Sequence, residues 1–346
     1  MPLNYPKYAV LLGAAAVLTA FSGCGEKAPA QTSAERDVFA MDTFMTMKAY
    51  GSGAETALEE AQQRIKQLED ELSVTSEDSD IFRINNAGGE AVEVSADAVT
   101  LIESGVSYWN ETSGALEISV YPVLAEWGFT TGNYKIPEPE RLKALLANVD
   151  SGKIEVNGSS VRIPEGSKID LGALAKGYTG DEIMDICREN GVASAIISLG
   201  GNVQTLGKKP DGSEWMVAVK DPFAPDTNMC VLSVSDRAVV TSGNYERYFT
   251  GDDGRDYWHI IDPKDGYPAD NGLVSVTVIG ESGLRCDALS TALFVAGTDV
   301  AESYLREHTD VDAVLVTDDD RLLYTVGIAD KLDNISGKSA EVIARD

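Results

Sequence analysis

Residues 169–202 read IDLGALAKGYTGDEIMDICRENGVASAIISLGGN, and this stretch decides the fold class of the chain. Asp170 ends an apolar segment and is followed by a glycine-containing turn, after which the spacing of apolar residues predicts a helix over 174–190. A short apolar run over 193–199 then predicts a buried strand. Helix and strand alternate closely here, which indicates an α/β (mixed α+β) fold.

The alternation continues on both sides of this stretch. Amphipathic helices are expected over 51–71 and 96–112, and strands over 37–49 and 231–241. Asn157-Gly158 predicts a hairpin turn between two short strands. No repeat or low-complexity segment interrupts the pattern, so we expect a single large unit, arranged as one or two lobes around a cleft.

Composition and charge exclude some classes of function. The chain has 346 residues, 43% of them hydrophobic, and a net charge of −28. No basic cluster stands out, which argues against nucleic acid as a partner, because such binding depends on Lys and Arg neutralising phosphates. A nucleotide site in so acidic a chain needs a local cation, either a lysine or a metal ion.

The N-terminus is typical of an exported protein. Lys7 is the only charged residue before Glu26, and residues 8–21 form an apolar run shorter than the roughly 20 residues that span a bilayer. The run ends in Phe-Ser-Gly-Cys24, which resembles the lipobox of bacterial lipoproteins. We therefore expect a signal peptide over 1–23, a tether over 24–35 and lipidation at Cys24, with the protein anchored outside the cytoplasm on the periplasmic or cell-surface side. An ordinary signal peptide with an incidental cysteine is the alternative.

Two glycine-containing turns are candidate ligand-binding segments. The turn after Asp170 would present backbone amides at a helix N-terminus, which favours anions, and Lys176 would add positive charge there. Gly200-Gly201, after the second predicted strand, would let the backbone approach a ligand closely. Both turns would equally suit a scaffold without a ligand.

Two further segments contain side chains suited to catalysis. His259 is one of only two histidines and ends an apolar strand, which makes it the best candidate for a general base, although a structural role is open. Asp287 and Thr291 lie four positions apart, so on a helix they share one face. A carboxylate and a hydroxyl in that arrangement suit a hard cation such as Mg²⁺, whereas the alternative is that Asp287 caps the helix.

These four segments, in this order, resemble the ApbE family of flavin transferases. Met41-Asp42-Thr43 also matches, as does Gly114-Ala115-Leu116-Glu117-Ile118 with the Trp-Gly-Phe that follows at 127–129. The resemblance extends over about residues 36–340. It implies that residues 36–346 form one ApbE-like catalytic unit around a cleft for FAD.

The resemblance also implies a reaction. Such proteins bind FAD and Mg²⁺ or another divalent metal, and they transfer FMN to a Thr or Ser hydroxyl of a membrane-associated acceptor flavoprotein, with AMP as the other product. Some relatives hydrolyse FAD to FMN and AMP instead. An FAD pyrophosphatase and a non-catalytic FAD-binding lipoprotein are therefore the alternative functions.

Site residues follow from the resemblance by position. The residues that it implies contact FAD are Met41, Ala115, Leu116, Glu117, Asp170, Lys176 and Ile261. The metal ligands that it implies are the Ala173 carbonyl, Asp287 and Thr291, with Ser290 assisting, and His259 is implied to be the base. Relatives often carry Asp in place of Glu117, and residues 72–75 lack an aromatic residue that many relatives have, which leaves the balance between transfer and hydrolysis open.

Overall fold

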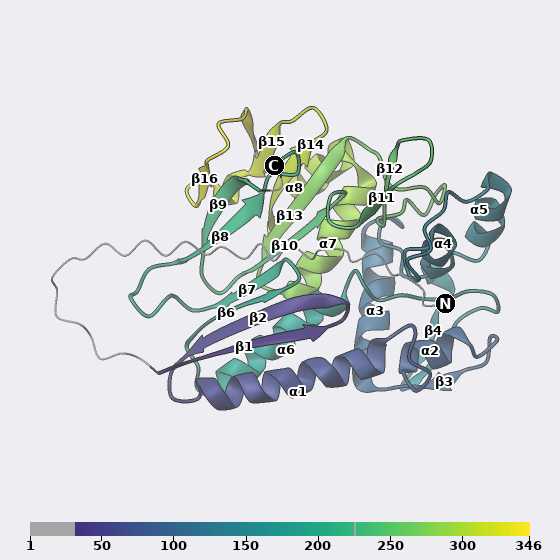
Figure 1. Ribbon diagram of the computed structural model, residues 1–346, viewed down its shortest axis with the longest axis horizontal. Helices are drawn as coiled ribbons and strands as arrows, with labels where there is room; N and C mark the ends of the chain where they lie inside the picture. Colours follow the sequence, from purple (N-terminus) through teal and green to yellow (C-terminus); the bar gives the residue numbers. More distant parts are fainter. Residues whose placement is uncertain (1–31, 225) are drawn as a thin grey trace, which may run out of the picture. The chain divides into compact units, whose positions relative to one another are not determined.

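A nine-stranded sheet organises the part of the chain that the computed structural model describes, residues 32–224 and 226–346 (Figure 1). Across the sheet the strands follow the order β1 (Ser33–Ala40), β2 (Thr43–Tyr50), β6 (Ser194–Leu199), β7 (Asn202–Leu206), β10 (Ala238–Gly243), β13 (Leu273–Gly280), β14 (Asp312–Thr317), β15 (Leu322–Thr325) and β17 (Ala340–Ile343). Neighbouring strands are antiparallel except β15 and β17, which are parallel. The predicted signal peptide and lipidation site lie outside the described residues.

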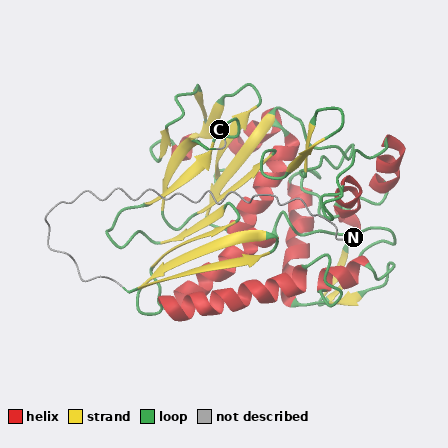
Figure 2. Cartoon of the chain, in the orientation of Figure 1, coloured by secondary structure: helices red, strands yellow, loops and turns green. Residues whose placement is uncertain are grey.

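Helices cover one face of this sheet (Figure 2). The helices packed on it are α1 (Ala54–Leu72) on β1 and β2, α6 (Ala175–Glu189) on β6 and β7, and α7 (Gly283–Ala296) on β10 and β13. The remaining α-helices of the described residues are α2 (Asp80–Asn85), α3 (Ala96–Glu111), α4 (Tyr121–Trp127), α5 (Pro139–Leu146) and α8 (Thr298–Glu307). Within these residues no helix is both long and apolar enough to cross a membrane.

The opposite face is covered by a three-stranded sheet of β8 (Trp215–Lys220), β9 (Asn228–Val234) and β16 (Leu332–Asn334). Its apolar side chains, such as Trp215, pack with Val239 and Ile279 of the main sheet. On the helical side, Val276 and Val278 of β13 pack against α7. Every residue of β13 is consequently buried, because both faces of that strand are covered.

Smaller elements complete the described chain. One sheet contains β3 (Val92–Glu93), β4 (Glu155–Asn157) and β5 (Ser160–Arg162), and a hairpin contains β11 (Tyr248–Thr250) and β12 (Asp256–Trp258). The 3₁₀ turns are η1 (Ser151–Lys153) and η2 (Val326–Ile328). A separate aromatic core around Trp127 and Phe129 supports the β11–β12 hairpin.

The structure confirms most of the predicted architecture. The mixed α/β class is correct, residues 32–346 form one compact unit, and α6, β6 and the β4–β5 hairpin lie where predicted. Two predicted strands are wrong, since 37–49 is split into β1 and β2 and 231–241 into β9 and β10. The breaks contain Met41, Asp42 and Asp236, which have φ values of 50°, 56° and 52°. Residues other than glycine rarely adopt this left-handed backbone conformation. Neither turn contains the Asn-Gly or Asp-Gly pair that usually indicates a hairpin.

Candidate functional site

Lys176 lies at the N-terminus of α6, beside the turn that Asp170 closes. The Gly172 N–H donates to Asp170 Oδ1 at 2.7 Å, which closes the turn, and Lys176 Nζ donates to the Gly172 carbonyl at 3.1 Å. The first turn of α6 contains no acidic residue, and no side chain of its N-cap residue, Leu174, caps the helix. The positive end of the helix dipole and Lys176 therefore lie at the same turn, where the Asp287 carboxylate of α7 accepts from one amide. That this turn binds an anion stays a prediction.

Helices α6 and α7 cap each other. The Gly177 N–H, in the first turn of α6, donates to Asp287 Oδ2 of α7 at 2.8 Å. In return, Asp181 of α6 accepts from the N–H groups of Gly283 and Leu284, at 2.6 and 3.0 Å, at the start of α7. A Cβ atom on Gly177 would lie 2.2 Å from the Gly283 carbonyl oxygen, so only glycine permits this approach. The crossing therefore places Asp287, only 3% exposed, beside the turn of α6.

The residues predicted to hold a metal ion offer oxygen atoms of the kind that a hard divalent cation binds. Within the described residues, neither the Ala173 carbonyl nor Asp287 Oδ1 accepts a hydrogen bond. Thr291, one turn after Asp287 on the same face of α7, adds a half-buried hydroxyl. Mg²⁺ takes oxygen ligands, and proteins often supply only one or two carboxylates to it, with waters and substrate phosphates completing the shell.

The described residues contain no group of three or more His, Cys, Asp or Glu side chains that could hold a metal ion. A cation here would therefore depend on one carboxylate, a carbonyl and a hydroxyl. Ser290 is fully buried, and its hydroxyl donates to the Asp287 carbonyl at 2.9 Å. The Ser290 side chain is thus occupied within the protein.

His259, just after β12, is held in the tautomer that a general base requires. Its backbone N–H donates to the Arg247 carbonyl at 3.1 Å, and its Nδ1 lies 3.2 Å from the same oxygen. Because a carbonyl oxygen only accepts, Nδ1 bears the proton and Nε2 keeps a free lone pair. Burial lowers the pKa of His259 to about 4, with a further lowering by the charges of Arg247 and Lys176 and an opposing effect of the hydrogen bond to Arg247. The imidazole is therefore neutral at pH 7.

The positive charges of Lys176 and Arg247 affect both His259 and Asp170 in the turn before α6. Burial raises the pKa of Asp170, whereas the Gly172 N–H and the positive charges of Lys176 and Arg247 oppose this. The same two cations lower the pKa of His259. Lys176 and Arg247 thus act on both groups, so the structure brings the first and third predicted segments into one electrostatic neighbourhood.

Met41 lies at the tip of the β1–β2 hairpin and reaches α6. Its N–H donates to Glu69 Oε1 at 2.7 Å, and its sulfur lies 3.8 Å from Thr179 Oγ1. The Gly200-Gly201 turn is adjacent, because a Cβ atom on Gly200 would lie 2.1 Å from Thr43 Oγ1. The hairpin and the glycine turn therefore meet beside α6.

Several of the residues predicted to contact FAD have side chains that are held by other parts of the protein. The Glu117 carboxylate accepts from the N–H and hydroxyl of Ser119 at 2.8 and 2.6 Å, and also from Ser151. Leu116 is 1% exposed and packs in a core with half-buried Ala115 against it, while Ile261 is 6% exposed and packs with Trp127. The side chains of Leu116 and Ile261 serve the core, so any contact with a ligand would come from their backbone. The hydrogen bonds of the half-buried Glu117 tie its carboxylate to Ser119 and to η1, and its contact with FAD stays a prediction.

Sequence reasoning missed Asp181, Ser242 and Arg247 as parts of this site. Ser242 and Arg247 lie between the Gly200-Gly201 turn and His259, and their residue types alone assign them no task. Asp181 interacts with residues about one hundred positions away, as its spacing from Ser282 and Gly283 shows. The periodicity of residues along the chain cannot indicate a contact between residues so far apart in sequence.

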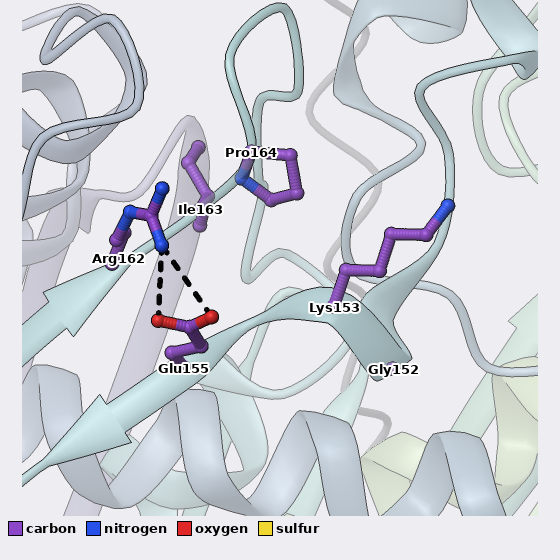
Figure 3. Close-up of a pocket in the computed structure, with 6 residues that line it drawn as sticks. All are labelled: Gly152, Lys153, Glu155, Arg162, Ile163 and Pro164. Atoms are coloured by element: carbon purple, nitrogen blue, oxygen red, sulfur yellow. Dashed lines mark hydrogen bonds and ion pairs between the residues drawn. The ribbon is translucent and has the colours of Figure 1, made fainter.

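A shallow pocket on the β4–β5 side of the molecule is separate from this site (Figure 3). Its volume is about 330 Å³, and it is lined by Gly152, Lys153, Glu155, Arg162, Ile163 and Pro164. Arg162 pairs with Glu155 inside it, at 3.2 Å, as the dashed lines show. None of the predicted site residues lines this pocket, so it is not the candidate site.

Comparisons with known proteins show the family to which the chain belongs. The model of the ApbE family matches residues 41–315. An FAD:protein FMN transferase of Treponema pallidum is 31% identical over 338 residues, which are 91% of this chain and 93% of that protein. One of Klebsiella pneumoniae is 36% identical over 261 residues, 74% of this chain and 80% of that protein. The crystal structure of the ApbE protein of Thermotoga maritima superposes with a TM-score of 0.79 and 32% identity, covering 84% of this chain and 96% of that one.

The fold and the relatives together define an enzyme of the flavin-transferase class. The chain belongs to the ApbE family.

Proposed function

We propose that this chain transfers FMN from FAD to a Thr or Ser hydroxyl of an acceptor flavoprotein and releases AMP, with Mg²⁺ or another divalent metal bound at the α6–α7 crossing. Relatives named FAD:protein FMN transferase support the donor and the transferred group. The observation that carries the proposal is the contact of His259 Nδ1 with the Arg247 carbonyl at 3.2 Å, which leaves Nε2 as the nitrogen that can accept a proton.

His259 would act as the general base. Its Nε2 would accept the proton of the acceptor hydroxyl as the oxygen of that hydroxyl attacks the phosphorus atom of the FMN half of FAD. A base with a low pKa keeps its lone pair at neutral pH, although the proton that it accepts is bound less tightly. Arg247 would orient the ring, since its carbonyl holds both the backbone N–H and Nδ1 of His259.

The residues around the turn before α6 would hold the pyrophosphate. Lys176 and the positive end of the α6 dipole, where Asp287 accepts only from the Gly177 amide, would attract its charge, and Asp170 would fix the turn through Gly172. Ala173, Asp287 and Thr291 would hold the divalent metal. When bound, this metal supplies charge neutralisation for the pyrophosphate and the departing AMP.

The N-terminal sequence supports a location for the reaction. Cys24 would be lipidated after removal of residues 1–23, and residues 24–35 would tether the enzyme to a bacterial membrane, on its periplasmic or cell-surface side. A tethered enzyme would meet acceptor flavoproteins that are themselves bound to the membrane. Growth with labelled palmitate followed by mass spectrometry of the N-terminal peptide would test this, and an unmodified Cys24 would contradict it.

The central experiment is an incubation of the purified chain with FAD, Mg²⁺ and an acceptor domain that bears the Thr motif. Intact mass spectrometry of the acceptor should show the addition of FMN, and chromatography should show one AMP released for each FMN added. EDTA should abolish both products. An acceptor whose motif Thr is replaced by Val is the matched control and should remain unlabelled.

Other outcomes would point to the alternative functions. Release of FMN and AMP at equal rates with either acceptor, and with neither one labelled, would contradict transfer and indicate an FAD pyrophosphatase. Bound FAD that stays intact with Mg²⁺ and acceptor would indicate a binding protein without catalysis.

A further inference from the structure

Ser242, near the end of β10, links the sheet to α7 through two hydroxyl contacts. Its Oγ lies 2.8 Å from Ser290 Oγ and 3.2 Å from Thr291 Oγ1. Strand β10 packs against α7, and the register of β10 with β13 pairs Ser242 with Val276. The residue belongs to a segment that matches the family, but neither the sequence pattern nor the proposed reaction gives it a role.

The direction of the hydrogen bonds around Ser242 can be worked out. The Ser290 hydroxyl donates its proton to the Asp287 carbonyl at 2.9 Å, so the Ser290 oxygen accepts at its contact with Ser242. Ser242 must then donate to Ser290, since each hydroxyl has one proton. The Ser242 oxygen is left as an acceptor, and the group 3.2 Å away that can donate to it is the Thr291 hydroxyl.

We infer that Ser242 is a positioning residue that orients the Thr291 hydroxyl toward the divalent metal. A neutral hydroxyl that coordinates a cation uses an oxygen lone pair, so its proton must point elsewhere, and Ser242 accepts that proton. Without Ser242, the Thr291 hydroxyl would rotate toward the helix carbonyl one turn back, as Thr side chains in helices commonly do. This inference rests on the metal site of the proposed function.

The neighbouring residue offers a matched comparison. Thr241 is also on β10, and its hydroxyl lies 2.8 Å from Thr277 Oγ1 of β13. Successive side chains of a strand point to opposite faces, so this hydroxyl pair lies on the face away from Ser242 and α7. Loss of the Thr241 hydroxyl therefore disturbs the same strand pair without touching the metal ligands.

The test is a titration of the full chain with Mn²⁺ alone, in which electron paramagnetic resonance measures the free ion. Partners of metal ligands typically change metal affinity by 10- to 100-fold when they are removed. We therefore expect Ser242→Ala to weaken Mn²⁺ binding by about tenfold or more. Ser242→Thr, which keeps the hydroxyl, should bind within about threefold of the unaltered chain, and so should Thr241→Val.

A transfer assay adds a second readout. Ser242→Ala should need a higher Mg²⁺ concentration for half-maximal rate, and much of its kcat should return at saturating Mg²⁺. A purely structural defect would lower the thermal unfolding midpoint without shifting the Mg²⁺ requirement, and it would contradict the inference.

Two results separate the inference from the function on which it rests. Equal Mn²⁺ affinity in Ser242→Ala and in the unaltered chain would overturn the role of Ser242 alone, as would an equal loss in Thr241→Val. Failure of the unaltered chain to bind Mn²⁺, with or without FAD, would overturn the metal site itself and the inference with it.

Discussion

The Gly177 amide and the Asp287 carboxylate are joined by a 2.8 Å hydrogen bond that ties the N-terminus of α6 to the second turn of α7. Asp181 returns the connection by capping the N-terminus of α7. The candidate metal ligand therefore has a structural task as well, since it satisfies an amide at a helix end that has no partner within its own helix. Asp287 Oδ2 accepts this hydrogen bond, and Oδ1 could bind a cation.

Because Asp287 both caps α6 and is a candidate metal ligand, we expect Asp287→Asn and Asp287→Ala to differ in stability. Asp287→Asn keeps an oxygen that can accept from Gly177 but removes the charge, so metal binding should be lost with little loss of stability. Asp287→Ala should also lower the free energy of unfolding by about 1–3 kcal/mol, because a buried N–H loses its partner. Mn²⁺ titration and urea unfolding of both variants would check this. Equal stability of the two would contradict the capping role.

The contact at Gly177 predicts a steric effect. A Cβ atom there would lie 2.2 Å from the Gly283 carbonyl and 2.7 Å from Asp287 Cβ, so Gly177→Ala should push the helices apart and cost about 1–3 kcal/mol or more. Metal affinity should fall with it. At Gly180, a Cβ atom would meet the amide end of Gln204 at 2.2 Å.

Gly180→Ala is therefore the milder variant, because a side chain moves more easily than a backbone carbonyl. Thermal unfolding of both variants, followed by circular dichroism, would measure the difference. A Gly180→Ala variant less stable than Gly177→Ala would contradict this explanation.

The pKa of His259 predicts how transfer depends on pH. Burial lowers this pKa to about 4, below the ordinary value near 6.5, so the imidazole stays an effective base throughout the range from pH 7 to about 5. As the pH falls through 4, the ring is protonated and kcat/KM should fall about tenfold per pH unit. Measurement of kcat/KM from about pH 3 to pH 8 at saturating Mg²⁺ would test this.

The His259 ring can also be titrated directly by NMR, because the chain contains only two histidines and His259→Gln identifies its signal. The His259→Gln variant should bind FAD with unchanged affinity and should transfer FMN at least about a hundredfold more slowly. A ring that titrates near 6.5 would show that burial does not control this group.

The hydrogen bonds of Glu117 predict that shortening its side chain lowers stability. Its carboxylate holds Ser119 and, across 34 positions of sequence, Ser151 of η1. Glu117→Asp is one methylene shorter and should not reach both serines, which should lower the free energy of unfolding by about 1–3 kcal/mol. Urea unfolding would measure this, with FAD affinity determined in parallel. A variant with normal stability and weakened FAD binding would instead support direct contact with the nucleotide.

The sequence by itself determined the local elements and the types of residue at the site. Helix α6, strand β6 and the glycine turns follow from apolar spacing and from residues with strong backbone preferences, which act over a few positions. Asp287 and Thr291 could be placed on one face for the same reason, because helical periodicity relates residues four apart. The hairpin at Met41 was missed, since its left-handed turn residues are not those that usually indicate such a turn.

Only the tertiary structure decided which of these groups meet. The contacts of Gly177 with Asp287, of Asp181 with Gly283 and of Ser242 with Thr291 join residues 110, 102 and 49 positions apart. Such pairs depend on how two helices cross and on which sheet face a strand residue occupies, and no local pattern encodes either. The burial of Leu116 and Ile261 and the pairing of Glu117 with Ser119 and Ser151 were decided in the same way, because packing and hydrogen bonding depend on residues from distant parts of the chain.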